Sequence, residues 1–298
     1  AAAAERSPAP RRQEAPTGGT VMKYRLSVLC DDAAATGEYL AEHGLSILVG
    51  LPNGRRWLMD TGTSDVFLRN AGRMGLSLDG LAGIVITHGH DDHTGGLAFY
   101  PRLGGAPPVY GHPCVFAKQY EVRKGEPVRV LGMPDRARRY ADPAFRPVRG
   151  TVELDEDLYL FTDIPREPGS HAPVEGKFFH EDGTGPCPIL EDATLAIRTP
   201  RGLVAVFGCA HAGYVNILKA IRRKFPGVRL LAVAGGLHLS GADERVLSDA
   251  AAYTDTFRDG GWTLHGGHCT GAKALAYIRE RYGDDAVKPL GAGRVIEF

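Results

Sequence analysis

Four potential metal ligands lie within six residues, directly after a short run of apolar residues. The run is Ile84-Val85-Ile86, which predicts a buried strand, and the ligands that follow it are His88, His90, Asp92 and His93. In an extended or tightly looped segment His88 and His90 can point the same way, while Asp92 and His93 turn toward an adjacent position. Imidazole and carboxylate ligands together suit catalytic zinc, iron or manganese better than a closed thiolate site. The cluster therefore predicts a loop that supplies two neighbouring metal ions at the end of a strand.

The pattern of apolar runs predicts a layered α/β fold around this loop. Strands are expected at 24–30, 45–51 and 56–59, followed by a helix at 64–74. Strands expected at 203–207, 230–234 and 262–264 alternate with helices at 215–223, 243–258 and 271–281. Between these halves, residues 101–190 are rich in Pro, Gly and charge, with short strands expected at 128–131, 152–154 and 158–161. The two halves are expected to form one four-layer sandwich, as a single domain over 22–298, behind a disordered tail at 1–21.

Charge and composition indicate no nucleic-acid or membrane partner. Lys and Arg together number 35, as do Asp and Glu, so the formal net charge is zero. The apolar runs are far shorter than the ~20 residues that span a bilayer, and the first twenty residues lack the apolar stretch of a secretory signal. The five cysteines include no CxxC pair, which favours a reducing compartment. We therefore expect a cytoplasmic protein with a small-molecule substrate, whose oligomeric state the sequence does not indicate.

The histidine cluster resembles a known signature. His88-x-His90-x-Asp92-His93, with a hydrophobic strand and Thr87 before it, matches the HxHxDH motif of the metallo-β-lactamase superfamily. The turn Asp60-Thr61-Gly62 is similar to an upstream Asp-Thr-Gly turn of the same superfamily, where the buried Asp supports the metal loop from behind its ligands. The resemblance implies the αββα sandwich of that superfamily and a pair of divalent metal ions.

Motifs outside the cluster resemble one branch of the superfamily, and this resemblance covers roughly residues 24–298. The branch consists of proteins similar to 7,8-dihydropterin-6-yl-methyl-4-(β-D-ribofuranosyl)aminobenzene 5′-phosphate synthase. The motifs are the segments 42–46, 208–213 with Asn216, 235–239 and 268–271.

The resemblance implies a ligand set for two metals. In the superfamily a third His completes the first site, a bridging Asp or a Cys completes the second, and a late His before a C-terminal helix closes it. His268 fits the late histidine. No Asp follows the strand expected at 203–207; Cys209 stands in that place, with His211 two residues on. We expect His211 to be the third ligand and keep Cys209 as the alternative. Asp92 is expected both to bind metal and to take part in catalysis.

The other histidines divide into two groups. His238 follows a Gly-Gly pair at the end of a strand, and we expect it to act on the substrate as a catalytic residue rather than to hold metal. His43 is left open between work at the site and a structural role within its hairpin. The remaining histidines, for which we expect surface or core roles, are His112, His171, His180 and His265. If His211 is not the third ligand, His112 or His171 would take that position.

Two metal ions about 3.5–4 Å apart can share a water, lower its pKa and hold the attacked group. The predicted function is therefore a metal-dependent hydrolase that acts on a small-molecule ester, a phosphoester or a lactone, with zinc as the expected ion and iron or manganese as alternatives. A second hypothesis is a transferase of the synthase type, in which an arylamine phosphate displaces pyrophosphate. A third, from another class, is a non-catalytic metal-binding sensor.

Overall fold

Alternating side chains place each central strand of the protein between two apolar layers. In β2 (Ser46–Gly50), Ile47 and Val49 face one cluster of buried residues, while Leu48 faces another. Successive side chains of a strand point to opposite faces of the sheet, so a strand covered on both faces is apolar throughout. Strand β13 (Gly202–Phe207) follows the same rule, with Val204 toward the first cluster and Ala205 toward the opposite side.

The structure is a computed structural model, and it describes residues 23–100, 107–122, 126–167, 178–256 and 261–298. The tail predicted at 1–21 and His171 lie outside these residues. None of the helices within the described ranges combines the length and the apolar character that a membrane span requires.

Two large sheets form the middle of the protein, and each contains seven strands. The first has the order β17–β1–β2–β3–β4–β5–β8. Its strands besides β2 are β1 (Arg25–Cys30), β3 (Arg56–Met59), β4 (Gly83–Val85), β5 (Val109–Gly111), β8 (Phe145–Pro147) and β17 (Val295–Glu297). The second has the order β16–β15–β14–β13–β12–β10–β9. Its strands besides β13 are β9 (Thr151–Asp155), β10 (Leu158–Phe161), β12 (Thr194–Thr199), β14 (Leu230–Gly236), β15 (Thr263–Gly267) and β16 (Val287–Pro289).

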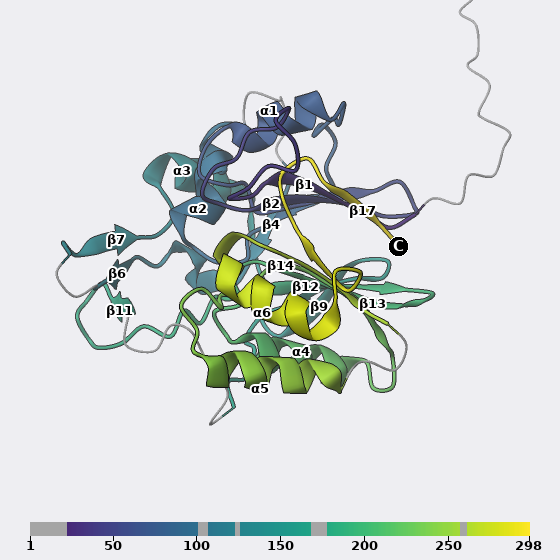
Figure 1. Cartoon of the computed structure of the whole chain (residues 1–298). Coiled ribbons are helices and arrows are strands. Elements are labelled where there is room, and N and C mark those ends of the chain that lie inside the picture. Colours follow the sequence, from purple (N-terminus) through teal and green to yellow (C-terminus); the bar gives the residue numbers. More distant parts are fainter. Residues whose placement is uncertain (1–22, 101–106, 123–125, 168–177, 257–260) are drawn as a thin grey trace, which may run out of the picture.

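Helices cover the outer face of each sheet (Figure 1). The first sheet packs against α1 (Val66–Arg73) and α3 (Asp135–Ala144), which bury Phe67 and Ala137 among its outward residues. The second packs against α4 (Tyr214–Lys224), α5 (Glu244–Asp255) and α6 (Ala272–Tyr282). The inner faces of the two sheets meet in a shared core. The predicted four-layer αββα sandwich is therefore confirmed.

A third, smaller sheet lies beside the sandwich, where Figure 1 shows it as a separate group of arrows. Its order is β11–β6–β7, with β6 at Gln119–Glu121, β7 at Arg129–Leu131 and β11 at Phe178–His180. The strands are antiparallel, and Glu121 pairs with both Arg129 and Phe178 across the sheet. Sequence analysis predicts β7 at 128–131 but neither β6 nor β11.

Candidate metal centre

The segments that carry the candidate ligands begin where neighbouring strands end. Strands β13, β14 and β15 are parallel to one another, so their carboxyl ends meet at one edge of the sheet, where open α/β sheets bind ligands. Cys209 and His211 follow β13, His238 follows β14, and His268 begins a short 3-10 turn after β15. From the first sheet, the segment after β4 leads into α2 (Asp91–Thr94) with the predicted cluster.

One group of ligand atoms consists of His88, Cys209 and His211, which lie within 4.8 Å of one another and are all buried. Burial holds the pKa of both histidines well below the ordinary value, so their rings are neutral. Within the described part of the chain, Nε2 of His88 and both ring nitrogens of His211 have no hydrogen-bond partner. Because an unpaired buried polar atom is costly, these lone pairs fit a bound cation.

His90 lies beside this group. Its ring centroid is 4.5 Å from that of His88 and 5.1 Å from that of His211. Its Nε2 lies 3.0 Å from Oε1 of Gln119, and Gln119 donates its amide to Glu191 at 2.7 Å. With the proton on Nε2, the other nitrogen of His90 keeps its lone pair. The sets of ligand atoms found within 4.8 Å of one another among the described residues do not include His90.

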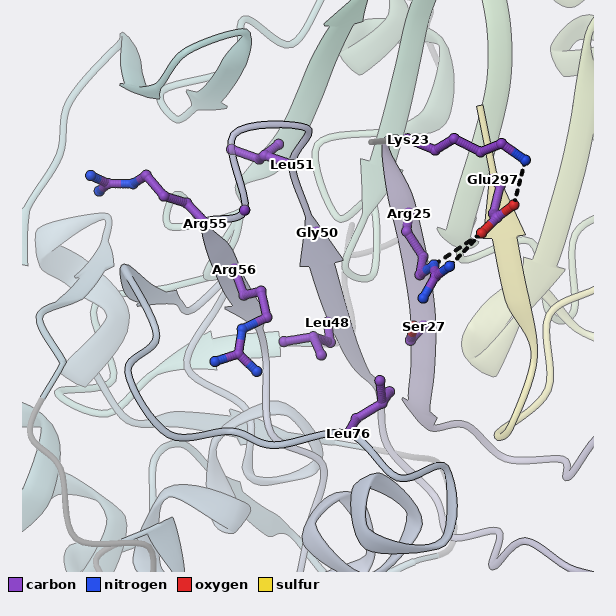
Figure 2. A pocket seen from close by; sticks show the side chains of 11 residues that line it. Lys23, Arg25, Ser27, Leu48, Gly50, Leu51, Arg55, Arg56, Leu76 and Glu297 are labelled. Carbon is purple, nitrogen blue, oxygen red and sulfur yellow. Dashed lines mark hydrogen bonds and ion pairs between the residues drawn. The ribbon is translucent and has the colours of Figure 1, made fainter. Parts of the chain in front are cut away.

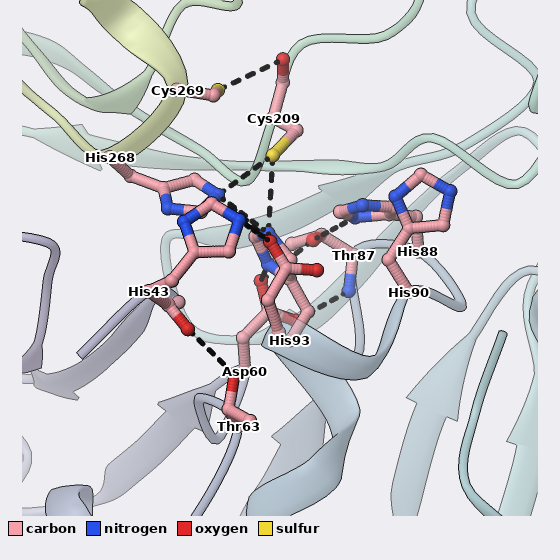
Figure 3. A network of polar contacts seen from close by, with 12 residues as sticks. His43, Asp60, Thr63, Thr87, His88, His90, His93, Cys209, His268 and Cys269 are labelled. Carbon is pink, nitrogen blue, oxygen red and sulfur yellow. Dashed lines mark hydrogen bonds and ion pairs between the residues drawn. The ribbon is translucent and has the colours of Figure 1, made fainter. Parts of the chain in front are cut away.

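A second group consists of His93, Cys209 and His268, again within 4.8 Å of one another. The Nε2 atoms of the two histidines are 3.1 Å apart, and Sγ of Cys209 lies 3.1 Å from one and 3.2 Å from the other (Figure 3). Oδ2 of Asp92 lies 3.3 Å from Nε2 of His268. Although burial alone would raise it, the pKa of Asp92 stays well below its usual range because of His93 and His268.

Cys209 thus belongs to both groups, and its sulfur lies between them. The sequence leaves Cys209 and His211 as alternatives for one ligand position. The structure places both against His88, so the two residues do not exclude each other. Burial raises the pKa of the Cys209 thiol well above its ordinary value, and its sulfur is within reach of the histidines of both groups.

Carboxylates behind the second group orient its two histidines. Oδ2 of the fully buried Asp60 lies 2.7 Å from Nδ1 of His93, and its two oxygens also accept the amide and hydroxyl of Thr87. Oδ1 of Asp32 lies 2.7 Å from Nδ1 of His268, whose backbone N–H donates to Asp31. Asp60 therefore lies behind a histidine of the cluster, as expected from the Asp-Thr-Gly turn.

Sequence analysis assigns no site role to Asp31, Asp32, Gln119 or Glu191. The pair of acids directly after the strand expected at 24–30 was a usable signal for Asp31 and Asp32. Nothing in the local sequence marks Gln119, which reaches His90 from the small sheet.

A cavity of about 410 Å³ opens onto both groups, and His43, His90, Asp92, His211, His238 and His268 are among the residues that line it. His238 has a positive φ of 48° and a ring centroid 4.6 Å from that of His211. It forms a third close set with Cys209 and Cys269, and its Nδ1 has no hydrogen-bond partner in the described chain. The structure therefore brings His238 to the cavity.

His43 stands at the mouth of this cavity, with its side chain 69% exposed. Its Nδ1 lies 2.9 Å from Asp32 and its Nε2 lies 3.4 Å from Asp92. The sequence left open whether His43 belongs to the site or only to its hairpin. The structure places His43 in contact with two acids of the site.

The remaining described histidines lie apart from the ligand groups. His112 contacts Asp163 through Nε2 at 3.0 Å and accepts the backbone N–H of Cys114 through Nδ1. His180 lies on β11 and His265 on β15.

A second hollow, of about 420 Å³, lies on the face of the first sheet turned away from the second (Figure 2). Its cations already have partners. Lys23 and Arg25 pair with Glu297, Arg55 pairs with Asp155, and Arg56 donates to backbone carbonyls. It holds none of the predicted ligands.

The sequence model of the metallo-beta-lactamase superfamily matches residues 40–224. This chain belongs to the metallo-beta-lactamase superfamily. It resembles the 7,8-dihydropterin-6-methyl-4-(beta-D-ribofuranosyl)-aminobenzene-5'-phosphate synthase of Methanocaldococcus jannaschii. The two proteins are 30% identical over 297 residues, which cover 94% of this chain and 98% of the synthase. The family and branch predicted from the motifs are thus confirmed.

Solved structures agree with this assignment. The crystal structure of Tm1679, a metal-dependent hydrolase of the beta-lactamase superfamily, superposes with a TM-score of 0.78 at 29% identity, covering 92% of this chain and 99% of that one. Zn(2+)-bound PqqB from Methylobacterium extorquens shares the fold, with a TM-score of 0.53 at 12% identity over 92% of this chain and all of that one.

Proposed function

We propose that this superfamily member is a metal-dependent hydrolase of a small-molecule phosphoester or lactone. The observation that carries the proposal is the set of buried imidazole nitrogens without hydrogen-bond partners, on His88 and His211, beside a second group around His93 and His268. Two adjacent groups of imidazole, thiol and carboxylate ligands suit two divalent cations.

His88, His90 and His211 would hold one ion, and Asp92, His93 and His268 would hold the other, with the thiol of Cys209 within reach of both groups. Bound divalent ions would supply an acidified water as nucleophile and a Lewis acid for the attacked group. Asp60 and Asp32 fix the rings of His93 and His268 through their Nδ1 atoms at 2.7 Å.

His238 is proposed as the proton donor to the leaving group. It lines the cavity from the end of β14, and its Nδ1 is buried without a partner in the described chain. General-acid help of this kind is worth ~10²–10⁴-fold in rate.

The test begins with elemental analysis of the purified protein, followed by a screen of phosphodiester, lactone and thioester substrates. We expect two equivalents of divalent metal and turnover of at least one ester class. His88→Ala and His90→Ala should each lose metal and activity while the chain stays folded by circular dichroism. His180→Ala, which changes a histidine outside the cavity, is the matched control. Normal metal content in both ligand variants, or less than one equivalent in the wild type, would overturn the proposal.

A second candidate function is a synthase-type transfer, in which an arylamine phosphate displaces pyrophosphate. It is favoured by the 30% identity to the M. jannaschii synthase over 94% of the chain. The two functions separate in one assay, because incubation of the metal-loaded protein with a pterin pyrophosphate and an arylamine phosphate releases pyrophosphate by transfer only when the amine is present.

A further inference from the structure

The small sheet forms one wall of the cavity. Residues two apart on a strand share a face of the sheet, and Arg129 and Leu131 of β7 both line the cavity. Glu121 of β6 and Phe178 of β11 line it as well. Glu121 stands opposite Arg129 on one side and Phe178 on the other. The wall therefore runs from Phe178, whose ring centroid is 5.5 Å from that of His90, outward to Arg129.

Arg129 is the only Lys or Arg among the described residues of this lining, which also contains the carboxylates Asp32, Asp91, Asp92 and Glu121. Its Nη1 donates to Oε2 of Glu121 at 3.2 Å, and this is the one polar contact of Arg129 within the described ranges. The side chain of Arg129 is 53% exposed, whereas that of Glu121 is 6% exposed. A guanidinium carries five N–H donors in a rigid fork, so this one retains donors for a ligand.

The apolar part of the wall lies between this cation and the histidines. Leu131 is 8% exposed and Phe178 is 5% exposed. A molecule that reaches from the ligand groups to Arg129 thus passes apolar surface before it meets a positive charge. Because this stretch of the wall is apolar, the polar groups at its two ends set the orientation of such a molecule.

We propose that Arg129 binds an oxyanion of the substrate, a phosphate or a carboxylate, at the end of the molecule away from the bond that reacts. Glu121 holds the guanidinium in place and is partly displaced as a partner when the anion binds. The inference rests on the proposed function only in placing the substrate in this cavity, because the binding it describes needs no turnover.

The test measures the affinity of phenyl phosphate, benzoate and inorganic phosphate for the metal-loaded protein by titration calorimetry. Arg129→Gln should weaken phenyl phosphate about 10- to 100-fold, the value of a charge-assisted hydrogen bond. Arg129→Lys should recover part of the loss. Glu121→Gln should tighten binding about 2- to 5-fold, since it removes the carboxylate that competes with the anion for the half-exposed guanidinium. A merely structural role of the pair predicts weaker binding in both Gln variants.

The matched control is Arg138→Gln, since Arg138 is also paired to a carboxylate and 45% exposed but does not line the cavity. Loss of affinity for phenyl phosphate alone assigns a phosphate subsite, and equal loss for benzoate assigns a general oxyanion subsite. Wild-type affinity of Arg129→Gln for both aromatic anions, with thermal unfolding unchanged, overturns the proposal. If no ester is hydrolysed but Arg129→Gln still weakens phenyl phosphate, the subsite stands and the proposed hydrolase fails.

Discussion

Replacement of Asp60 by Asn tests whether a buried carboxylate that contacts His93 raises the affinity of the site for metal. Oδ1 of Asp60 accepts the backbone N–H of Thr87 at 2.8 Å, and Oδ2 accepts the Thr87 hydroxyl and faces Nδ1 of His93, both at 2.7 Å. Asn keeps the shape but replaces one oxygen by an N–H₂ donor. Whichever way the amide turns, a buried donor then faces another donor.

The magnitude follows from these contacts. A buried donor left without an acceptor costs about 1–3 kcal/mol, so the free energy of unfolding should fall by about that amount. Loss of the carboxylate behind a metal-binding imidazole typically lowers metal affinity about 10- to 100-fold. The positive φ of Asp60, 54°, adds no cost because Asn also tolerates that region.

The assay is competition with a chromophoric chelator, combined with urea unfolding of the metal-free protein. Asp65→Asn at the N-terminus of α1 is the control, because Asp65 pairs with Arg69 and is not among the residues that line the cavity. If Asp60→Asn bound zinc as tightly as the wild type while losing stability, the carboxylate would be structural only. If neither quantity changed, the argument from buried donors would be wrong.

Three further predictions concern single side chains. Cys209→Ser should leave most metal bound, whereas His211→Ala should remove one ion by elemental analysis; the reverse result would make the thiol the essential ligand. His238→Ala should keep two metals and lower turnover ~10²–10⁴-fold, least for esters with good leaving groups, and equal loss on every leaving group would reassign it. Burial lowers the pKa of His265 from 6.5 to about 4, so as pH falls from 6.5 the unfolded chain gains a proton that the folded chain does not, and stability decreases. His265→Gln should flatten this dependence in urea titrations on chelator-treated protein, and an unchanged slope would contradict it.

The loop of candidate ligands was predictable because its residues lie within six positions of the sequence. His88, His90, Asp92 and His93 need only one strand and one turn to come together, so their spacing carries the geometry. His268 and Cys209 could be named only through the resemblance to a family, since their approach depends on the parallel pairing of β13, β14 and β15. Sequence distance says nothing of that pairing.

Elements with weak local signals were missed for physical reasons. The helix α3 contains Pro143 and several charged residues, so its apolar face is short, with Ala137 and Ala141 as its buried residues. Strand β17 is three residues long and forms only by pairing with β1. Gln119 reaches His90 from a sheet whose strands are each three residues long, too few for a period to be read.

The ligands that meet at the cavity arrive from both sheets of the sandwich. His88 and His93 follow β4 of the first sheet, whereas Cys209 and His268 follow β13 and β15 of the second. An ion bound by ligands from both sheets would cross-link the two sheets, with a strength set by the free metal concentration. At a concentration a thousand times its Kd, such an ion adds about 4.1 kcal/mol to stability. We therefore expect metal starvation to make the protein more susceptible to proteolysis as well as inactive. Its abundance should then follow the supply of the metal ions.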